Sequence, residues 1–364
     1  MKTTYLLLCL LGIGSISGAG QTKQPQKIGD FIESTSYNEH RRNATRSLQY
    51  TPDGDDFVCI NGKNRFTRAL YGSHTAFRLE TSDRPVFAAY TKENPKHICF
   101  KLQTSGGTVA LDSTEHCESR YTAGRRSYSL SDPAFGGRSL SITTWALPDK
   151  EGAIWQFNAM NFKEFHPVLL ASISEIRNSK LNRNGDMGAD PADSFEAPLQ
   201  PQQLQSFPVQ IDGTLYILLE NQELRTLTTA EGENLFKKAE AARSETASRI
   251  RIETPDPYFN TLGGTLAMAA DGIWDGEVWL HGAIGWRMPL SGWRAAYTGD
   301  VLGWHDRART HFNAYAASQV TEVPNTLPHP AQDSALHLAR SVKKWGTPQY
   351  LSLIHISEPT RLLS

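Results

Sequence analysis

Short apolar segments separated by turn residues fill the chain from about Asp56 to Glu220. Each segment is rich in β-branched and aromatic residues and is bounded by Gly, Pro, Asn or Asp, which is typical of a β-strand. The predicted strands are residues 57–60, 76–79, 97–102, 139–145, 153–157, 168–173 and 214–219. Strands of this length at regular spacing predict an antiparallel β-sandwich.

Two dipeptides in this region favour tight hairpin turns. Asn61-Gly62 and Asp212-Gly213 accept the positive φ angles of a type I′ turn, so we expect a hairpin at residues 60–63 and another at 211–214.

The sequence pattern changes at about Thr228. Residues 230–243 predict a surface helix of mixed charge that links two domains. Asp256 is placed to cap the next helix, with Pro257 in its first turn. An apolar stripe that we expect to face a core follows at Phe259, Leu262, Leu266, Ala269 and Ile273. Further helices are predicted at 286–297, 306–320 and 331–344, so the second domain is expected to be all-helical.

Both ends of the chain carry segments that we expect to be absent from the native folded protein. Lys2, an apolar run at 5–13 and small residues at 15–20 predict a secretory signal peptide over residues 1–20. Residues 351–361 match the translation of a transposon-end adapter used in sequencing libraries, so 351–364 is predicted to be a non-native tail and the native protein to continue past Tyr350. The predicted organisation is then a flexible segment at 21–44, a β-sandwich at 45–227, a linker helix at 228–255 and the start of a helical domain at 256–350.

Charge and cysteine content narrow the choice of partners and compartment. With 37 basic and 38 acidic residues and no long run of like charge, we expect no nucleic-acid partner. After signal cleavage we expect no membrane insertion, and a location in the periplasm or outside the cell. Three cysteines then remain, Cys59, Cys99 and Cys117, either with a disulfide between Cys99 and Cys117 or as buried free thiols.

Tryptophans are concentrated where the helices begin. Indole rings can stack on the faces of sugar rings, although any one of them can instead pack a core. Polar residues are interleaved with these rings, among them Asp271, Asp275, Glu277 and Arg294. The predicted substrate-binding residues are Trp279, His281, Trp286, Arg287, Trp304, His305 and Arg307. We expect an oligo- or polysaccharide substrate.

Hydrolysis of a glycosidic bond needs two carboxyl groups. The catalytic candidates are Asp300 and Asp306, and helix capping explains Asp306 equally well. No metal site or cofactor is predicted, except for a structural calcium ion as the less favoured alternative to a solvated loop at Asn182, Asn184, Asp186 and Asp190. Phosphate-loop, zinc-protease and serine-hydrolase motifs are absent from the sequence.

Several longer strings resemble one group of proteins. They are residues 50–58, 65–72 and 184–190, Trp279-Leu-His-Gly-Ala-Ile-Gly-Trp-Arg287 and Gly303-Trp-His-Asp-Arg-Ala-Arg309. Together they resemble large secreted proteins of glycan-degrading Gram-negative bacteria, in which a β domain of unassigned function precedes an (α/α)6 toroid of the six-hairpin glycosidase superfamily. The resemblance implies a sandwich packed on a helical toroid, with glycan hydrolysis in the toroid's cleft.

The expected function is therefore that of the N-terminal portion of a glycoside hydrolase-like protein, with an active site that is incomplete in this chain. A polysaccharide lyase is an alternative, because His281, Tyr297 and Arg294 could abstract a proton and neutralise a uronate. A non-catalytic glycan-binding protein is the third hypothesis.

A partial toroid would leave the apolar faces of its first helices without partners. We therefore expect the 1–364 chain to aggregate, and residues 45–225 alone to fold. Size-exclusion chromatography and thermal melting of both polypeptides check this expectation. A monodisperse 1–364 chain that melts cooperatively would contradict it.

Overall fold

The computed structural model describes residues 50–62, 66–72, 77–90, 96–162, 165–175, 205–211, 213–280 and 295–317. All of them belong to Gln49–Ser364, the second of the two units into which the chain divides. The predicted signal peptide, the flexible segment 21–44, the calcium-loop candidates, the helix at 331–344 and the tail at 351–364 lie outside the described residues.

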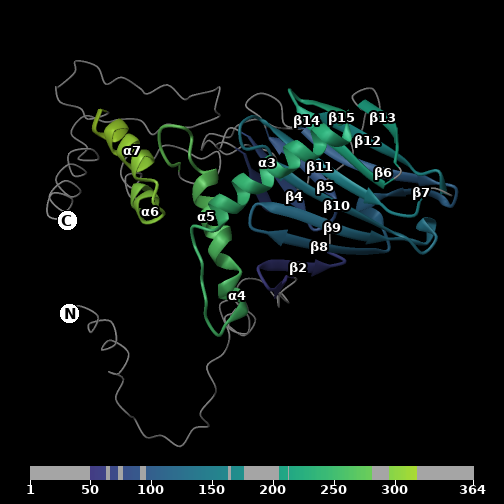
Figure 1. Ribbon diagram of the computed structural model, residues 1–364, viewed down its shortest axis with the longest axis horizontal. Helices are drawn as coiled ribbons and strands as arrows, with labels where there is room; N and C mark the ends of the chain where they lie inside the picture. Colours follow the sequence, from purple (N-terminus) through teal and green to yellow (C-terminus); the bar gives the residue numbers. More distant parts are fainter. Residues whose placement is uncertain are drawn as a thin grey trace, which may run out of the picture. The chain divides into compact units, whose positions relative to one another are not determined.

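The described strands form two antiparallel sheets (Figure 1). Sheet A has the order β1 (Thr51–Asp53), β2 (Asp56–Ile60), β8 (His116–Thr122), β9 (Arg125–Ser131), β10 (Ser139–Ala146), β11 (Gly152–Ala159), β14 (Gly213–Glu220) and β15 (Glu223–Leu227). Sheet B has the order β13 (Gln205–Gln210), β12 (Val168–Glu175), β6 (Lys96–Thr104), β5 (Val86–Tyr90), β4 (Arg78–Ser82) and β3 (Phe66–Tyr71), and β7 (Gly107–Ala110) also pairs with β6. Short 3₁₀ turns follow β7 at Leu111–Ser113 and β9 at Pro133–Phe135.

One apolar core lies between the two sheets. Alternate residues of each strand point into it, as the pleat of a β-strand requires. At its centre Phe87 and Phe100 of sheet B meet Tyr128 and Trp155 of sheet A in edge-to-face contacts, with ring centroids 5.4 to 5.9 Å apart. This arrangement confirms the predicted sandwich of antiparallel sheets.

A buried arginine joins the two sheets at one side of this core. Arg126 of β9 is fully buried and donates from Nη2 to the Ser82 carbonyl oxygen at 2.8 Å and to the Tyr50 hydroxyl at 2.6 Å. Asp83 lies 3.8 Å from the same nitrogen and accepts a hydrogen bond from Tyr50. A buried charge is stable only when it is paired and hydrogen-bonded in this way.

Neither predicted hairpin forms. β2, before Asn61, belongs to sheet A and β3 belongs to sheet B, and likewise β13 and β14 on the two sides of Asp212-Gly213 lie in different sheets. Asn61 and Gly213 do have positive φ angles, 51° and 86°. The strands before and after each of them nevertheless lie in different sheets. A type I′ pair of positive φ angles occurs instead at Asn221 and Gln222, between β14 and β15.

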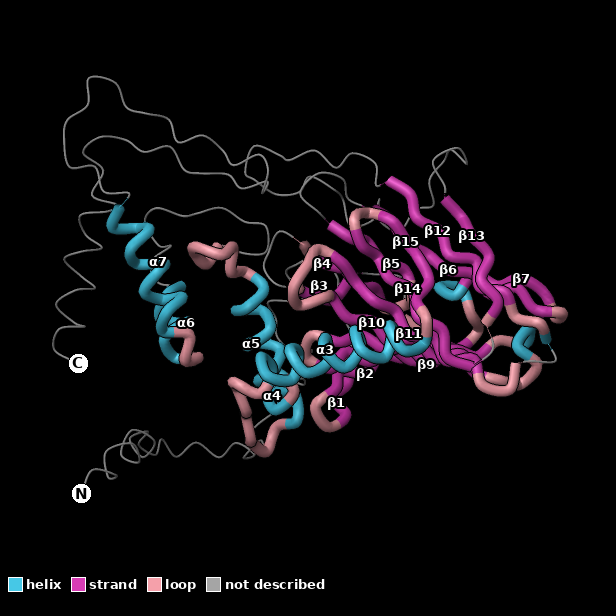
Figure 2. The backbone as a smooth tube through the Cα atoms, turned by 45° about the horizontal axis from the view of Figure 1, so that its top comes forward, coloured by secondary structure: helices cyan, strands magenta, loops and turns pink. Residues whose placement is uncertain are grey.

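Helix α3 (Thr229–Ala247) lies across the outer face of sheet A (Figure 2). A capping box between Thr228 and Glu231 starts it. Its inner side, with Ala239 and Phe236, packs on Trp145 and on the outward-facing side chains of β11 and β14. The mixed-charge helix predicted at 230–243 is therefore present, and it is packed along one side onto the sandwich.

The next helices are α4 (Pro257–Asn260) and α5 (Leu262–Gly272), and Asp256 caps α4 as predicted, accepting from the Tyr258 amide at 2.9 Å. The predicted apolar stripe is only partly buried: Phe259, Leu266 and Ala269, which we expected to face a core, are exposed. The small residues of α5 face inward instead: a Cβ on Gly264 would stand 3.3 Å from the Ala247 Cβ. Close packing of α5 against α3 therefore selects the face of small residues.

Helices α6 (Ala295–Val301) and α7 (His305–Ala317) follow. Ala296 of α6, Ala308 of α7 and Leu302 between the two helices form a separate apolar cluster with Trp274 and Trp279. Residues 281–294, which include most of the helix predicted at 286–297, lie outside the described part. Among the helices that the structure describes, none has both the length and the apolar content needed to cross a membrane. The toroid itself stays a prediction.

The three cysteines among the described residues, Cys59, Cys99 and Cys117, are free thiols. Cys117 points into the core between the sheets, whereas Cys99 lies between the core residues Ile98 and Phe100 and so points to the opposite face of sheet B. The disulfide between Cys99 and Cys117 is therefore absent, and the alternative of free thiols is correct. Burial raises the pKa of the Cys117 thiol to about 12, which keeps it protonated.

His97 gives the sandwich a pH-dependent stability. Its side chain is 3% exposed, neither ring nitrogen has a hydrogen-bond partner among the described residues, and burial lowers its pKa to about 4. The unfolded chain binds this proton near pH 6.5, whereas the folded chain binds it only near pH 4. The contribution of His97 to the free energy of unfolding should therefore be fully present above about pH 6.5 and should fall by about 3 kcal/mol as the pH drops toward 4. Urea unfolding at several pH values measures the slope.

The substitution His97→Gln should reduce that slope, because it removes the titrating group. His116→Gln is the matched control, since His116 is exposed and its substitution should leave the slope unchanged. Equal slopes in the wild type and His97→Gln would contradict the assignment.

Candidate functional site

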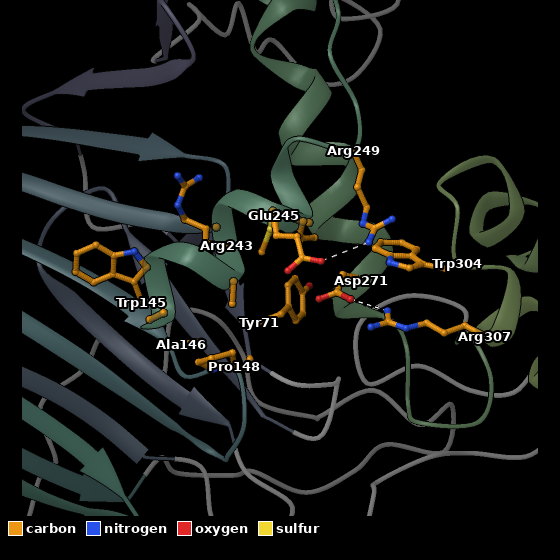
Figure 3. A pocket seen from close by; sticks show the side chains of 16 residues that line it. Tyr71, Trp145, Ala146, Pro148, Arg243, Glu245, Arg249, Asp271, Trp304 and Arg307 are labelled. Atoms are coloured by element: carbon orange, nitrogen blue, oxygen red, sulfur yellow. Dashed lines mark hydrogen bonds and ion pairs between the residues drawn. The ribbon is translucent and has the colours of Figure 1, made fainter. Parts of the chain in front are cut away.

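A cleft of ≈ 350 Å³ lies where the sandwich, α3, α5 and α7 meet (Figure 3). We call it the junction cleft. The sandwich contributes Tyr71 and Trp145, and α3 with the residue that follows its C-cap contributes Arg243, Glu245 and Arg249. Its other charged or aromatic lining residues are Asp271, Trp304 and Arg307. Two carboxylates, three guanidinium groups and aromatic rings thus face one cavity.

Trp304 is the centre of the helical side of the cleft. It is 9% exposed and belongs to the apolar cluster of α6 and α7. The guanidinium carbon of Arg249 lies 5.0 Å from the centre of its ring, and that of Arg307 lies 4.8 Å from it. Cation–π contacts of this length hold both guanidinium groups beside the indole (Figure 3).

Asp271 at the end of α5 forms an ion pair with Arg307. Arg307 Nη1 donates to Asp271 Oδ1 at 2.6 Å, and the carboxylate is only 14% exposed. Burial raises the pKa of Asp271, and the hydrogen bond from Arg307 opposes that rise. The charge of Arg249 also opposes it, so the cleft contains a carboxyl group whose protonation depends on burial and on two arginines, with Arg307 the stronger of the two.

Tyr71 at the end of β3 covers the neighbouring part of the cleft. Gly272 lets its ring lie against α5, because a Cβ at that position would stand 2.3 Å from the ring carbons. Burial raises the pKa of Tyr71 to about 12, so its hydroxyl keeps its proton at neutral pH. Tyr71 is thus a hydroxyl donor and an unsuitable base for proton abstraction.

The α3 side of the cleft combines one rigid and one loosely paired arginine. Arg243 donates to both carboxylate oxygens of Glu240, at 2.6 and 2.9 Å, and to the Ala123 carbonyl oxygen at 2.9 Å. Arg249 donates to the Leu302 carbonyl oxygen at 2.8 Å, but its ion pair with Glu245 is 3.7 Å long. Glu245 is 78% exposed, so water already solvates most of it.

Of the predicted substrate-binding residues, Trp304 and Arg307 line the junction cleft. Trp279 is 1% exposed and is a core residue: its indole nitrogen donates to the Ala270 carbonyl oxygen at 3.0 Å. His305 lies 3.2 Å from Asp300 at the surface, away from the cleft lining. His281, Trp286 and Arg287 lie outside the described residues.

The two catalytic candidates do not meet. Asp300 pairs with His305, while Asp306 is 95% exposed, lies in the first turn of α7 and contacts Arg309 at 3.2 Å. Neither lines the junction cleft. Asp306 lies in the first turn of α7 and not at the position before the helix that a capping residue takes, because α7 already begins at His305. Among the described residues no group of three or more His, Cys, Asp or Glu side chains could hold a metal ion.

Tyr71, Glu245 and Arg249 are cleft residues that the sequence did not single out as site residues. Tyr71 stands in one of the strings that carry the family resemblance, which was its available signal. Glu245 and Arg249 belong to a mixed-charge segment, where the sequence does not distinguish a solvated charge from one that faces a cleft.

A family model described as a domain of unknown function (DUF4450) matches residues 95–249. The match extends from β6 to the end of α3, so the family segment includes the α3 side of the cleft and ends before Asp271, Trp304 and Arg307. It also agrees with the predicted N-terminal domain of unassigned function. A search of curated proteins found no significant match.

Arg307 should control the protonation of Asp271. The substitution Arg307→Ala removes the hydrogen bond and charge that oppose the effect of burial, so the pKa of Asp271 should rise further. Carbon-detected NMR titration of the carboxyl group, assigned with Asp271→Asn, measures it.

Arg309→Ala is the matched control, because Arg309 pairs with the exposed Asp306 and should leave Asp271 unchanged. An unchanged or lower pKa of Asp271 in Arg307→Ala would show that Arg307 does not set it.

Proposed function

We propose that this protein binds a glycan in the junction cleft and forms the N-terminal portion of a secreted, glycoside hydrolase-like protein. The observation that carries the proposal is the set of Trp304, Arg249, Arg307 and Asp271 around one cavity. Planar guanidinium and carboxylate groups make paired hydrogen bonds with adjacent sugar hydroxyls, and the exposed part of the Trp304 ring adds apolar contact for the C–H groups of a sugar.

Hydrolysis by this cleft would require two carboxyl groups, one acid and one base or nucleophile. Asp271 and Glu245 are the two described carboxyl groups in its lining. The raised pKa of Asp271 is the property that a general acid needs. These two residues therefore replace Asp300 and Asp306 as the carboxyl pair that we propose for testing.

Non-catalytic glycan binding is the second candidate function. It is favoured by the 2.6 Å ion pair of Asp271 with Arg307, because an arginine at that distance stabilises the carboxylate and opposes its use as an acid. The lyase hypothesis draws no support from Tyr71, whose hydroxyl keeps its proton, and Tyr297 does not line the junction cleft.

The test is incubation of the full-length protein, of which we propose that this chain is the N-terminal portion, with neutral and acidic plant and host polysaccharides. New reducing ends without ultraviolet absorbance indicate a hydrolase, absorbance from an unsaturated product indicates a lyase, and retention in affinity electrophoresis without cleavage indicates a binder. We expect Trp304→Phe to weaken glycan retention about tenfold, because a smaller ring no longer holds both arginines.

Tyr297→Phe is the matched control, since Tyr297 lies on α6 outside the cleft lining. Melting temperatures of both variants separate a binding effect from unfolding. The proposal fails if no glycan is retained by the wild type, or if folded Trp304→Phe binds as well as the wild type. Amino-terminal sequencing of the exported protein tests the proposed signal cleavage.

A further inference from the structure

The arginines of the junction cleft differ in how firmly they are paired. Arg243 is held by two contacts to Glu240, and Arg307 by its 2.6 Å contact to the mostly buried Asp271. Arg249 has Glu245 as its acidic partner among the cleft-lining residues, at 3.7 Å, and that partner is 78% exposed. An exposed ion pair of this length contributes little stability, so Arg249 is the cation that a ligand can take over.

Arg249 is nevertheless fixed in position. Its Nη1 donates to the Leu302 carbonyl oxygen at 2.8 Å, and its guanidinium group lies beside the Trp304 ring. Its Nη2 is the nitrogen that faces Glu245. A guanidinium group already held in one orientation loses little conformational entropy when it binds a planar anion.

We propose that the junction cleft prefers glycans with an anionic group, and that this group replaces the Glu245 carboxylate on Arg249. The inference rests on the proposed glycan binding and specifies its substrate class. A uronate carboxylate and a sulfate ester share the required chemistry, a delocalised anion that accepts hydrogen bonds from a guanidinium group. Asp271 and Arg307 then bind hydroxyl groups on the same or the adjacent sugar.

Glu245 has a defined part in this preference. Because it pairs with the Arg249 nitrogen that the anion would bind, it competes with an acidic ligand. Removing its charge should therefore strengthen the binding of acidic glycans and leave neutral glycans nearly unchanged. A residue that merely stabilised α3 would change the binding of acidic and neutral glycans alike.

The experiment is calorimetric titration of the full-length protein with matched pairs of ligands. One pair is oligogalacturonide and its methyl-esterified form, and the other is a sulfated galactan oligosaccharide and its desulfated form. We expect the acidic member of at least one pair to bind at least about tenfold more tightly than its neutral partner, because one charged hydrogen-bonded pair is lost in the neutral form. The pair that shows the difference identifies the source of the anion.

Three variants complete the test. Arg249→Ala should abolish the preference for the acidic member, and Glu245→Gln should increase the affinity for it about threefold. Arg251→Ala is the matched control, because Arg251 is 87% exposed, pairs with the exposed Glu253 and does not line the cleft. Glu245→Gln keeps the inference testable even if Arg249→Ala does not fold.

Equal affinity for acidic and neutral members, or a preference that survives in folded Arg249→Ala, would overturn the inference and leave glycan binding intact. A lower affinity of Glu245→Gln for the acidic ligand would also overturn it. Absence of binding to every glycan would overturn the proposed function together with the inference.

Discussion

Glu240 is the residue on which the position of α3, and with it one side of the junction cleft, depends. Its carboxylate accepts from the Trp145 indole nitrogen at 2.8 Å, and Arg125 contacts it from the sandwich at 3.3 Å. Arg243, one turn along α3, completes the set. Burial opposes ionisation of Glu240, but these donors outweigh it and lower its pKa. One partly buried carboxylate therefore fixes the helix on the sheet and orients the side chains that follow it.

Sequence patterns predicted the strands because each sheet has one face in the core, which imposes an alternation that can be read directly. They did not predict which strands pair. Asn61 has the positive φ angle that its type suggests, but the partner of the next strand is decided by packing between sheets. The same limit applies to α5. Its close contact with Ala247 turns Gly264 inward, and not the leucines of the predicted stripe. Periodicity locates an amphipathic segment, and close packing decides its orientation.

The candidate site was predictable to the extent that it lies in one stretch of sequence. Trp304 and Arg307 stand together near the start of α7, among the aromatic and charged residues that mark the region. Arg249 precedes Trp304 by 55 positions in the sequence but lines the same cavity, because α3 and α5 pack against each other. A contact of that separation leaves no local pattern, so Arg249 was found only in the folded chain.

The cluster of tryptophans has two roles that the sequence could not separate. Trp279 packs between Trp274 and Trp304, with ring centroids 4.6 and 6.4 Å away, and its nitrogen is used within the core. Trp304 belongs to the same packing, yet its ring also supports the two arginines of the cleft. The core of the helical segment therefore sets the distance between those arginines. The glycan recognition that we propose for the cleft would depend on this core, because a shift of Trp304 would move both guanidinium groups together.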